Sequence, residues 1–263
     1  MTIVADLCTF LDALAPPALA AEWDNVGLLV GDAAQNVERV MTCLTVTPAA
    51  TAEAIRERAD LIITHHPLPF KPLKRLTADQ PAGRILLDLI RAEIAIYSPH
   101  TAFDSAAAGI NQQLAEGLGL TAIRPLEPSE RLPAGLGAGR WGVLSQTQTL
   151  GQHAAILKRF LKIGGLHVVG HLQMPMDRVA VACGSAGEFL DAAIQHGCQV
   201  LVTGETRLHA CYEAESRGVA LLLAGHYASE RFGVERLADV LADSFRGLTV
   251  WASRDESDPL TWH

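Results

Sequence analysis

The residues of this sequence best suited to chemistry are histidines and acids. They fall in three short segments: His65-His66, His100-x-x-x-Asp104 and His226-x-x-x-Glu230. Residues four apart share one face of a chain that enters a helix. Imidazoles together with carboxylates suit Zn, Mn, Fe or Ni better than Mg or Ca, and this number of donors is enough for two ions bridged by a carboxylate. One such histidine alone is more often an ordinary hydrogen-bonded residue. Because they recur together at matched positions, they predict a dinuclear metal site.

These residues follow segments that read as buried strands. Short apolar runs predict strands over residues 40–46, 60–64, 93–98, 178–183, 199–203 and 219–224. Helical spacing predicts helices over residues 3–14, 50–58, 83–92, 188–196 and 231–245. Such alternation favours an α/β layer fold. Ligands of open α/β sheets bind outside the carboxyl ends of the strands, which is where the histidines fall.

The two halves of the chain predict an internal duplication. Val40 to Thr64 and Val179 to Thr203 span the same number of residues, with an Ala-Ile pair at the same offset, and each copy continues to a strand followed by His-x-x-x-acid. The segment 125–142 is rich in Pro and Gly and reads as a linker or domain boundary. We therefore expect domains 1–126 and 127–263, the first with the His65-His66 and His100/Asp104 motifs and the second with Thr203-Gly204-Glu205 and His226/Glu230.

Composition narrows the classes of protein. Of 263 residues, 49% are hydrophobic and 19% charged, which excludes disorder, and the net charge of -8 argues against a broad surface for nucleic acid or anionic lipid. No apolar run is long enough to cross a membrane, and no signal peptide is recognised, so a cytoplasmic protein is expected. The five cysteines form no C-x-x-C pair and indicate neither a disulfide framework nor a cysteine-type zinc site.

Several phrases resemble those of one family. They are Glu22-Trp-Asp-Asn-Val-Gly-Leu28, Thr64-His-His-Pro-Leu-Pro-Phe-Lys-Pro-Leu-Lys-Arg-Leu76, His100-Thr-Ala-Phe-Asp104, Thr203-Gly-Glu205 and Ala224-Gly-His-Tyr-Ala-Ser-Glu-Arg231. They are similar to the NIF3-like dinuclear metal-centre proteins, whose members are often labelled GTP cyclohydrolase 1 type 2. The resemblance covers essentially the whole chain.

The resemblance implies a fold, an assembly and a ligand set. The fold is α/β, with two related, intertwined domains built from mixed sheets flanked by helices, and the assembly is a ring-like homohexamer. Two divalent ions, of Zn, Fe, Mn or Ni, are implied to bind to five residues: His65, His66, Asp104, His226 and Glu230.

This chain departs from the family in two respects. Its length matches a short form without the domain that some members carry between the halves. Position 45 is Thr where the family commonly places Asp, so a carboxylate near the metal ligands is missing and metal affinity or preference is expected to shift.

Other residues are secondary candidates. His100 aligns with ligand His226 in the repeat and is either a general acid/base or a hydrogen-bonding neighbour of the ligands. Glu205 and His209 suggest a proton shuttle, although Glu205 alone reads equally well as a helix cap.

A basic cluster and a tryptophan complete the candidates. Lys71, Lys74 and Arg75 are suited to a triphosphate, although a solvated loop is the commoner role of such a cluster. Trp23 either stacks on a base or packs in the core.

Three functions fit these residues. The first is a metal-dependent hydrolase of GTP cyclohydrolase type, in which water adds at C8 of guanine, the ring opens and formate leaves. The second is a non-catalytic metal-binding or regulatory ring. The third is a metal-dependent phosphoester hydrolase, which uses the same pair of ions on phosphate.

Overall fold

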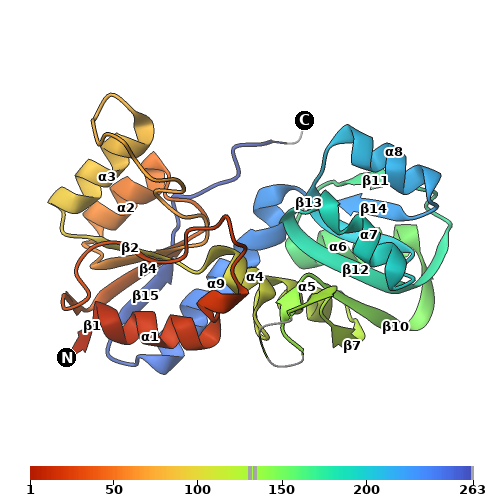
Figure 1. The fold of residues 1–263 in the computed structure, drawn as a ribbon, viewed down its shortest axis with the longest axis horizontal. Coiled ribbons are helices and arrows are strands. Elements are labelled where there is room, and N and C mark those ends of the chain that lie inside the picture. Colours follow the sequence, from red (N-terminus) through yellow and green to blue (C-terminus); the bar gives the residue numbers. More distant parts are fainter. Residues whose placement is uncertain (130–131, 133–134, 262–263) are drawn as a thin grey trace. The chain divides into compact units, whose positions relative to one another are not determined.

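Contacts divide the chain into two compact units. The computed structural model describes residues 1–129, 132 and 135–261. Unit 1 comprises Met1–Phe103 and Gly233–Pro259, and unit 2 comprises Asp104–Phe232 with the described residues from Leu260 on (Figure 1). Two of the passages between the units lie inside helices, α4 (His100–Ser105) and α9 (His226–Ser244), and a third follows Pro259.

Unit 1 is built on a mixed sheet in the order β15-β4-β5-β6-β2. Its strands are β2 (Gly27–Val30), β4 (Arg39–Cys43), β5 (Leu61–Thr64), β6 (Ala95–Ser98) and β15 (Thr249–Ala252). All neighbours are parallel except β2, which runs antiparallel to β6. A separate two-residue ladder pairs β1 (Thr2–Ile3) with β3 (Asn36–Val37).

Helices cover both faces of this sheet. The helices of unit 1 besides α4 and α9 are α1 (Val4–Leu14), α2 (Pro48–Arg56), α3 (Pro81–Arg91) and the short 3-10 turn Pro17–Leu19. The α2 and α3 side bears an apolar cluster that includes Met41, Ile62 and Leu89. On the other side, the Tyr97 hydroxyl donates to Asp12 of α1 and the Thr42 hydroxyl donates to the Val234 carbonyl of α9. Burial of the strands on both faces explains their continuous apolar runs.

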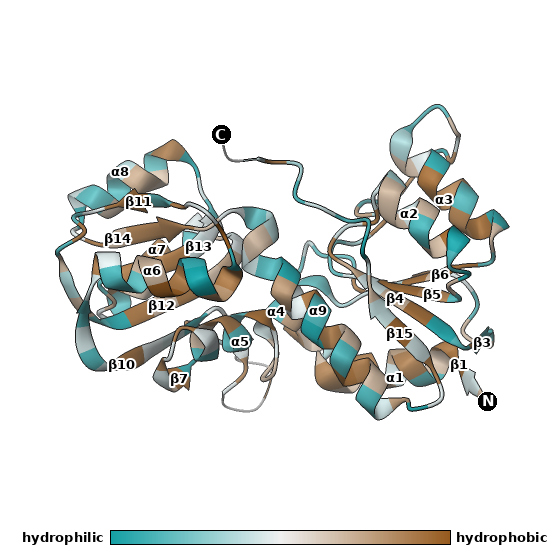
Figure 2. Ribbon diagram, turned by 180° about the vertical axis from the view of Figure 1, so that it is seen from behind, coloured by the Kyte–Doolittle hydropathy of each residue, from teal (hydrophilic) through white to brown (hydrophobic). Residues whose placement is uncertain are grey.

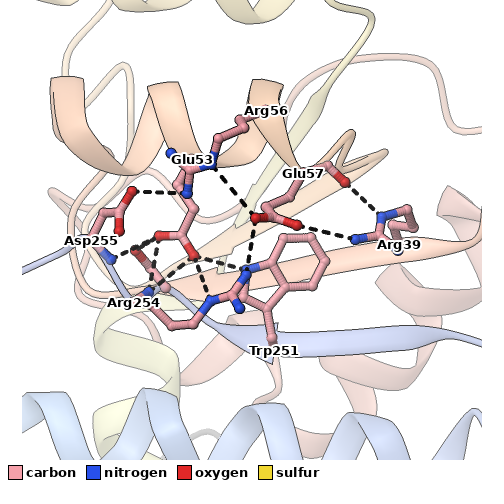
Figure 3. A network of polar contacts seen from close by, with 8 residues as sticks. Arg39, Glu53, Arg56, Glu57, Trp251, Arg254 and Asp255 are labelled. Atoms are coloured by element: carbon pink, nitrogen blue, oxygen red, sulfur yellow. Dashed lines mark hydrogen bonds and ion pairs between the residues drawn. The ribbon is translucent and has the colours of Figure 1, made fainter.

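The buried carboxylate of Glu53, on α2, forms hydrogen bonds with the segment that follows β15. Glu53, whose side chain is fully buried, accepts hydrogen bonds from the Trp251 indole, the Ser253 hydroxyl and the backbone N–H of Arg254 and Asp255 (Figure 3). Burial alone would raise the pKa of Glu53, but these bonds, that from Ser253 first, outweigh it and lower the pKa to about 2.

Unit 2 has a mixed sheet in the order β11-β14-β13-β12-β10-β7. These strands are β7 (Thr121–Arg124), β10 (Arg140–Thr149), β11 (His167–Val169), β12 (Pro175–Ser185), β13 (Val200–Glu205) and β14 (Ala220–Leu223). The three strands β12, β13 and β14 are parallel and the outer pairs antiparallel. A small ladder pairs β8 (Glu127–Pro128) with β9 (Gly137–Ala138).

In the described part of unit 2, helices cover both faces of the sheet. They are α5 (Ile110–Gly117), α6 (Leu150–Leu161), α7 (Leu190–Gln195), which follows a 3-10 turn at Gly187–Phe189, and α8 (Leu208–Ser216). One apolar cluster joins α5 and α6 to the face of Val179 and Val202, and another joins α7 and α8 to the face of Ala180 and Leu201. Figure 2 shows the resulting pattern of apolar strands and two-faced helices.

The predicted α/β fold, with mixed sheets flanked by helices, is confirmed. The division into units does not coincide with the predicted domains 1–126 and 127–263, because β15 and most of α9 return to the sheet of unit 1. The segment 125–142, expected to be a linker, contains β8, β9 and the start of β10 inside unit 2, and its Pro133 lies outside the described residues. Within the described part of the chain, no helix is both long and apolar enough to cross a membrane.

Candidate metal centre

The histidine dipeptide directly follows β5 and is held by both neighbouring strands. The backbone N–H groups of His65 and His66 donate to carbonyls of Cys43 and Leu44, at 3.0 and 2.8 Å. The hydroxyl of Ser98, at the end of β6, donates to the His65 carbonyl at 2.6 Å. These bonds fix the dipeptide at the carboxyl edge of the sheet of unit 1, where the sequence predicts it.

A third imidazole from the same edge joins the pair. His100 starts α4 two residues after β6, and its ring centroid lies 5.1 Å from that of His65 and 5.6 Å from that of His66. One ring nitrogen from each of the three histidines lies within 4.8 Å of the other two. His65 is almost fully buried, whereas His66 and His100 are partly exposed. Three imidazoles at this spacing can bind one divalent ion of the borderline type.

The ring of His66 is oriented by Thr45. The Thr45 hydroxyl lies 2.7 Å from Nδ1 of His66, so the opposite nitrogen, Nε2, points away from Thr45. The loop that carries Thr45 is itself fixed by Glu256, whose carboxylate accepts the N–H groups of Leu44 and Thr45. A neutral hydroxyl, and not a carboxylate, thus makes this contact to the ring.

The ring of His100 is oriented by Asp24. Oδ1 of this carboxylate lies 2.7 Å from Nδ1 of His100, and Oδ2 accepts the N–H and hydroxyl of Thr101. Burial would raise the pKa of Asp24, but the hydrogen bonds from His100 and Thr101 lower it to about 2, so the carboxylate is ionised. His100 also has a φ of +25°, a backbone conformation that non-glycine residues rarely adopt and that clusters at functional sites.

In unit 2, two acids lie around the end of β12. The Cys183 thiol donates to Oδ1 of Asp104 at 3.2 Å. Burial, together with the negative charges of Asp104 and Glu230, raises the pKa of Cys183 far above its usual value, so the group is a neutral thiol. Glu230 is only 3% exposed. Both acids therefore lie near the Cys183 thiol, and their carboxylates are suited to a divalent cation.

The backbone after Asp104 is fixed by a buried cation. Arg140 is 1% exposed, and its guanidinium donates to the carbonyls of Ser105, Ala106, Gly137 and Gly139. Burial lowers the pKa of Arg140 to about 10. Because this value is still well above 7, the guanidinium is charged at neutral pH. The position of Asp104 is therefore set by hydrogen bonds that begin at the next residue.

His226 starts α9 between two carboxylates of the same unit. Its Nδ1 lies 2.9 Å from Oε1 of Glu205, and its Nε2 lies 3.2 Å from Oε2 of Glu230. The hydrogen bond with Glu230, reinforced by that with Glu205, raises the pKa of His226 to about 9 against the effect of burial. Glu205 ends β13 and contacts His226, so it orients this ring as Asp24 orients His100.

A glycine leaves room for Glu230. Gly184 has a φ of +67°, and a Cβ built on it would lie 2.3 Å from Oε1 of Glu230 and 3.4 Å from Nε2 of His226. Its N–H donates to the Ser229 hydroxyl at 2.9 Å. Backbone of β12 therefore packs directly against the acid and the histidine.

The donor chemistry in both units fits divalent ions such as Zn, Fe, Mn or Ni. In unit 1, two of the three imidazoles have Nδ1 engaged by a fixed oxygen, which directs Nε2 away from that oxygen, as is usual for histidine ligands of metals. Unit 2 offers Asp104, His226 and Glu230, two carboxylates and an imidazole. Both clusters are compatible with a dinuclear metal centre.

The remaining predicted residues lie in exposed positions. Lys71, Lys74 and Arg75 are exposed in the loop between β5 and α3, and His209 is exposed in the first turn of α8. Among the described residues, His209 takes no part in the contacts that join Glu205, His226 and Glu230. The roles given to these four residues stay predictions.

Sequence reasoning missed Asp24 and Cys183. Asp24 is 76 positions from the histidine it orients, and Cys183 is 79 positions from Asp104. The sequence signal for Asp24 is its place in the phrase Trp23-Asp24-Asn25, which suggests a substrate-facing loop.

Known proteins are similar to this chain along most of its length. Residues 2–259 match the family described as Duf34/NIF3 (NGG1p interacting factor 3). The GTP cyclohydrolase 1 type 2 homolog of Clostridium acetobutylicum is 34% identical over 86% of this chain and 85% of its own length. NIF3-like protein 1 of Drosophila melanogaster is 32% identical over 95% of this chain and 86% of its own length. The crystal structure of a Bacillus cereus protein related to NIF3 superposes with a TM-score of 0.91 at 25% identity, covering 100% of this chain and 99% of that one. The chain therefore belongs to the DUF34/NIF3 family, that of the GTP cyclohydrolase 1 type 2 homologs.

Proposed function

We propose that this protein is a divalent-metal-dependent hydrolase that opens the purine ring of GTP and releases formate. The observation that carries the proposal is the cluster of His65, His66 and His100, whose ligand atoms lie within 4.8 Å of one another. Support also comes from relatives named GTP cyclohydrolase 1 type 2 homologs. The proposed metal ligands are those the resemblance implied: His65, His66, Asp104, His226 and Glu230.

The protein supplies orientation and proton transfer. Two divalent ions, when bound, would lower the pKa of a water molecule toward neutrality and so supply hydroxide for addition at C8 of guanine. His100 is proposed to transfer protons at Nε2, because Asp24 holds its Nδ1 and compensates a positive charge on the ring. Such a histidine–carboxylate pair keeps one tautomer in place during proton transfer.

The exposed cations of the loop after β5 are proposed to bind the triphosphate. Lys71, Lys74 and Arg75 lie within ten residues of His66 in the sequence, in a chain whose net charge is -8. Their exposure leaves them accessible to a polyanion, which arginine and lysine bind through charge-assisted hydrogen bonds. Glu205 and His209 are proposed to relay protons at the rim of the cluster in unit 2.

The test is product analysis with metal-loaded protein. Protein loaded in turn with Zn, Fe, Mn or Ni is incubated with GTP and with a panel of phosphodiesters, and three products are measured: formate, inorganic phosphate and the alcohol released from each diester. We expect formate from GTP and its loss on chelation. Phosphate chemistry without formate favours the phosphoester hydrolase, and the absence of both products favours a non-catalytic metal-binding ring; either outcome overturns the proposal.

The His66→Ala variant tests the ligand assignment. We expect it to lose bound metal and formate release while it keeps the circular dichroism spectrum of the wild type, because the ring is partly exposed. His209→Ala is the matched histidine variant, and it keeps its metal because its ring lies on the exposed start of α8. Wild-type metal content in His66→Ala would refute the assignment.

A further inference from the structure

Two aromatic side chains of unit 1 are exposed beside the histidine cluster. Trp23 is 64% exposed and Phe70 is 42% exposed, and their ring centroids lie 5.9 Å apart. Both rings also contact His100, at centroid distances of 6.0 Å for Trp23 and 6.2 Å for Phe70. A tryptophan that packs in the core buries most of its surface, whereas Trp23 exposes most of its own. The core-packing alternative for Trp23 is therefore wrong.

The backbone under both rings is fixed. The residue after Trp23 is Asp24, whose carboxylate is fully buried and binds His100 and Thr101. The Asn25 side chain donates to the carbonyl of Pro69 at 2.7 Å, which ties the Trp23 loop to the residue before Phe70. Both rings are therefore exposed on a backbone that hydrogen bonds hold in place. A ligand that binds to them loses little free energy to ordering of this loop.

The surroundings of the two rings suit a nucleobase. Trp and Phe faces stack on any planar heteroaromatic ring with little dependence on its identity. The cation Lys71 follows Phe70 directly, and Lys74 lies in the same exposed loop, where either can meet the phosphates of a nucleotide. A ring placed against Trp23 would also lie near His100, the proposed proton-transfer group.

We propose that Trp23 and Phe70 form an aromatic wall that binds the substrate by stacking on its purine base. This proposal rests on the proposed function, because it names the part of the nucleotide that the site recognises. The wall binds the base, whereas the cations of the same loop bind the phosphates, so the two contributions are separable with fragments of the substrate.

The experiment measures binding of fragments by calorimetry to intact protein, without turnover. The probes are guanosine, ribose 5-phosphate and tripolyphosphate. We expect Trp23→Ala to weaken guanosine binding about 5- to 150-fold, and to leave tripolyphosphate binding unchanged. Trp23→Phe keeps a ring and is expected to retain most of the affinity. Tyr212→Ala removes an aromatic ring of similar exposure from α8 and is expected to change neither affinity.

Each outcome bears on one proposal. No binding of guanosine to the wild type, or equal guanosine affinity in Trp23→Ala, overturns the stacking proposal. A change of assembly size in Trp23→Ala with unchanged guanosine affinity also overturns it and assigns the wall to contacts between copies. Guanosine binding that depends on Trp23, in protein that releases no formate with any metal, supports the wall and overturns the proposed reaction alone.

Discussion

At the scale of single residues, three histidines differ in the group that holds Nδ1. His66 contacts the hydroxyl of Thr45, whereas His100 and His226 contact the carboxylates of Asp24 and Glu205. A carboxylate raises the basicity of an imidazole ligand more than a hydroxyl does, because it stabilises positive charge on the ring. Of the two proposed metal ligands among them, His66 and His226, His66 is therefore the weaker donor, and a neutral contact orients its ring.

Removal of that contact is expected to weaken metal binding. Thr45→Val keeps the shape of the side chain but frees the His66 ring to rotate, so we expect a loss of about 10- to 100-fold in metal affinity. Competition with a chromogenic chelator measures it. Thr45→Ser restores the hydroxyl and is expected to bind as the wild type does. Equal affinity in Thr45→Val would show that the hydroxyl does not orient His66.

The space at Gly184 gives a second prediction. In Gly184→Ala, the new Cβ would lie 2.3 Å from Oε1 of Glu230 and clash with it, and displacement of this acid is expected to reduce bound metal. Gly218→Ala is the matched control, since Gly218 has a similar φ of +71° but nothing within 4 Å of an added Cβ. Both variants are expected to lose about 1–2 kcal/mol of stability from the left-handed backbone, measured by urea unfolding. Only Gly184→Ala is expected to lose metal by elemental analysis, and equal losses would contradict a specific role.

At the scale of elements, α2 serves as an anchor for a distant segment. Its Glu53 accepts hydrogen bonds from Trp251, Ser253, Arg254 and Asp255. The next residue, Glu256, accepts those of Leu44 and Thr45 beside the histidine dipeptide. The segment 251–256 thus holds both the helix and the loop that orients His66.

The pKa of Glu53 predicts how stability depends on pH. Its folded-state pKa is about 2 against an ordinary value of 4.5, so its contribution is fully present above about pH 5 and is lost as the pH falls from 4.5 toward 2. Glu53→Gln is expected to lower stability at pH 7 by about 1–3 kcal/mol, and this deficit is expected to shrink toward pH 3. Urea unfolding at both pH values measures it.

A neighbouring acid serves as the control. Glu57 makes partly exposed ion pairs with Arg39, Arg56 and Arg254, so Glu57→Gln is expected to cost less than about 1 kcal/mol at any pH. A deficit in Glu53→Gln that stays constant down to pH 3 would contradict the assigned ionisation.

Several elements with a local signal were predictable, whereas strands formed by distant pairing were not, and the helices α5, α6 and α8 were not predicted either. The helix α1 and the strand β5 match their predicted ranges within about one residue, because their apolar spacing is continuous. β10 was missed because Gly142 and a polar run from Ser145 hide its alternation. β15 was missed because only its pairing with β4 makes it a strand.

The same distinction holds for the candidate site. Histidines and acids at strand ends could be named because their types are unusual there, and the three imidazoles of unit 1 follow from two neighbouring strands. The hydrogen bonds that orient these rings could not be predicted, since Asp24 reaches His100 from a loop 76 positions away and Glu205 reaches His226 from the end of β13. The type and sequence position of an acid such as Asp24 do not indicate which imidazole it will contact.

At the scale of the molecule, the predicted assembly is open to direct measurement. The resemblance to NIF3-like proteins implies a homohexamer, so we expect a particle of about six times 28.1 kDa by light scattering coupled to gel filtration. The measurement is made with and without added metal, at two protein concentrations. A mass of one or two chains at the higher concentration would contradict the prediction.

Unit 1 is formed by two separate stretches of the chain, and this has a consequence for its folding during translation. Unit 2 is drawn almost entirely from one stretch, Asp104–Phe232, whereas the sheet of unit 1 lacks an edge until Thr249–Ala252 arrives beside β4. During translation, unit 2 can therefore fold before unit 1 is complete. The groups that donate hydrogen bonds to Glu53 are synthesised about 200 residues after it. Until then β4 has a free edge for unwanted strand pairing, so truncation before residue 249 is expected to yield a chain that aggregates or engages chaperones.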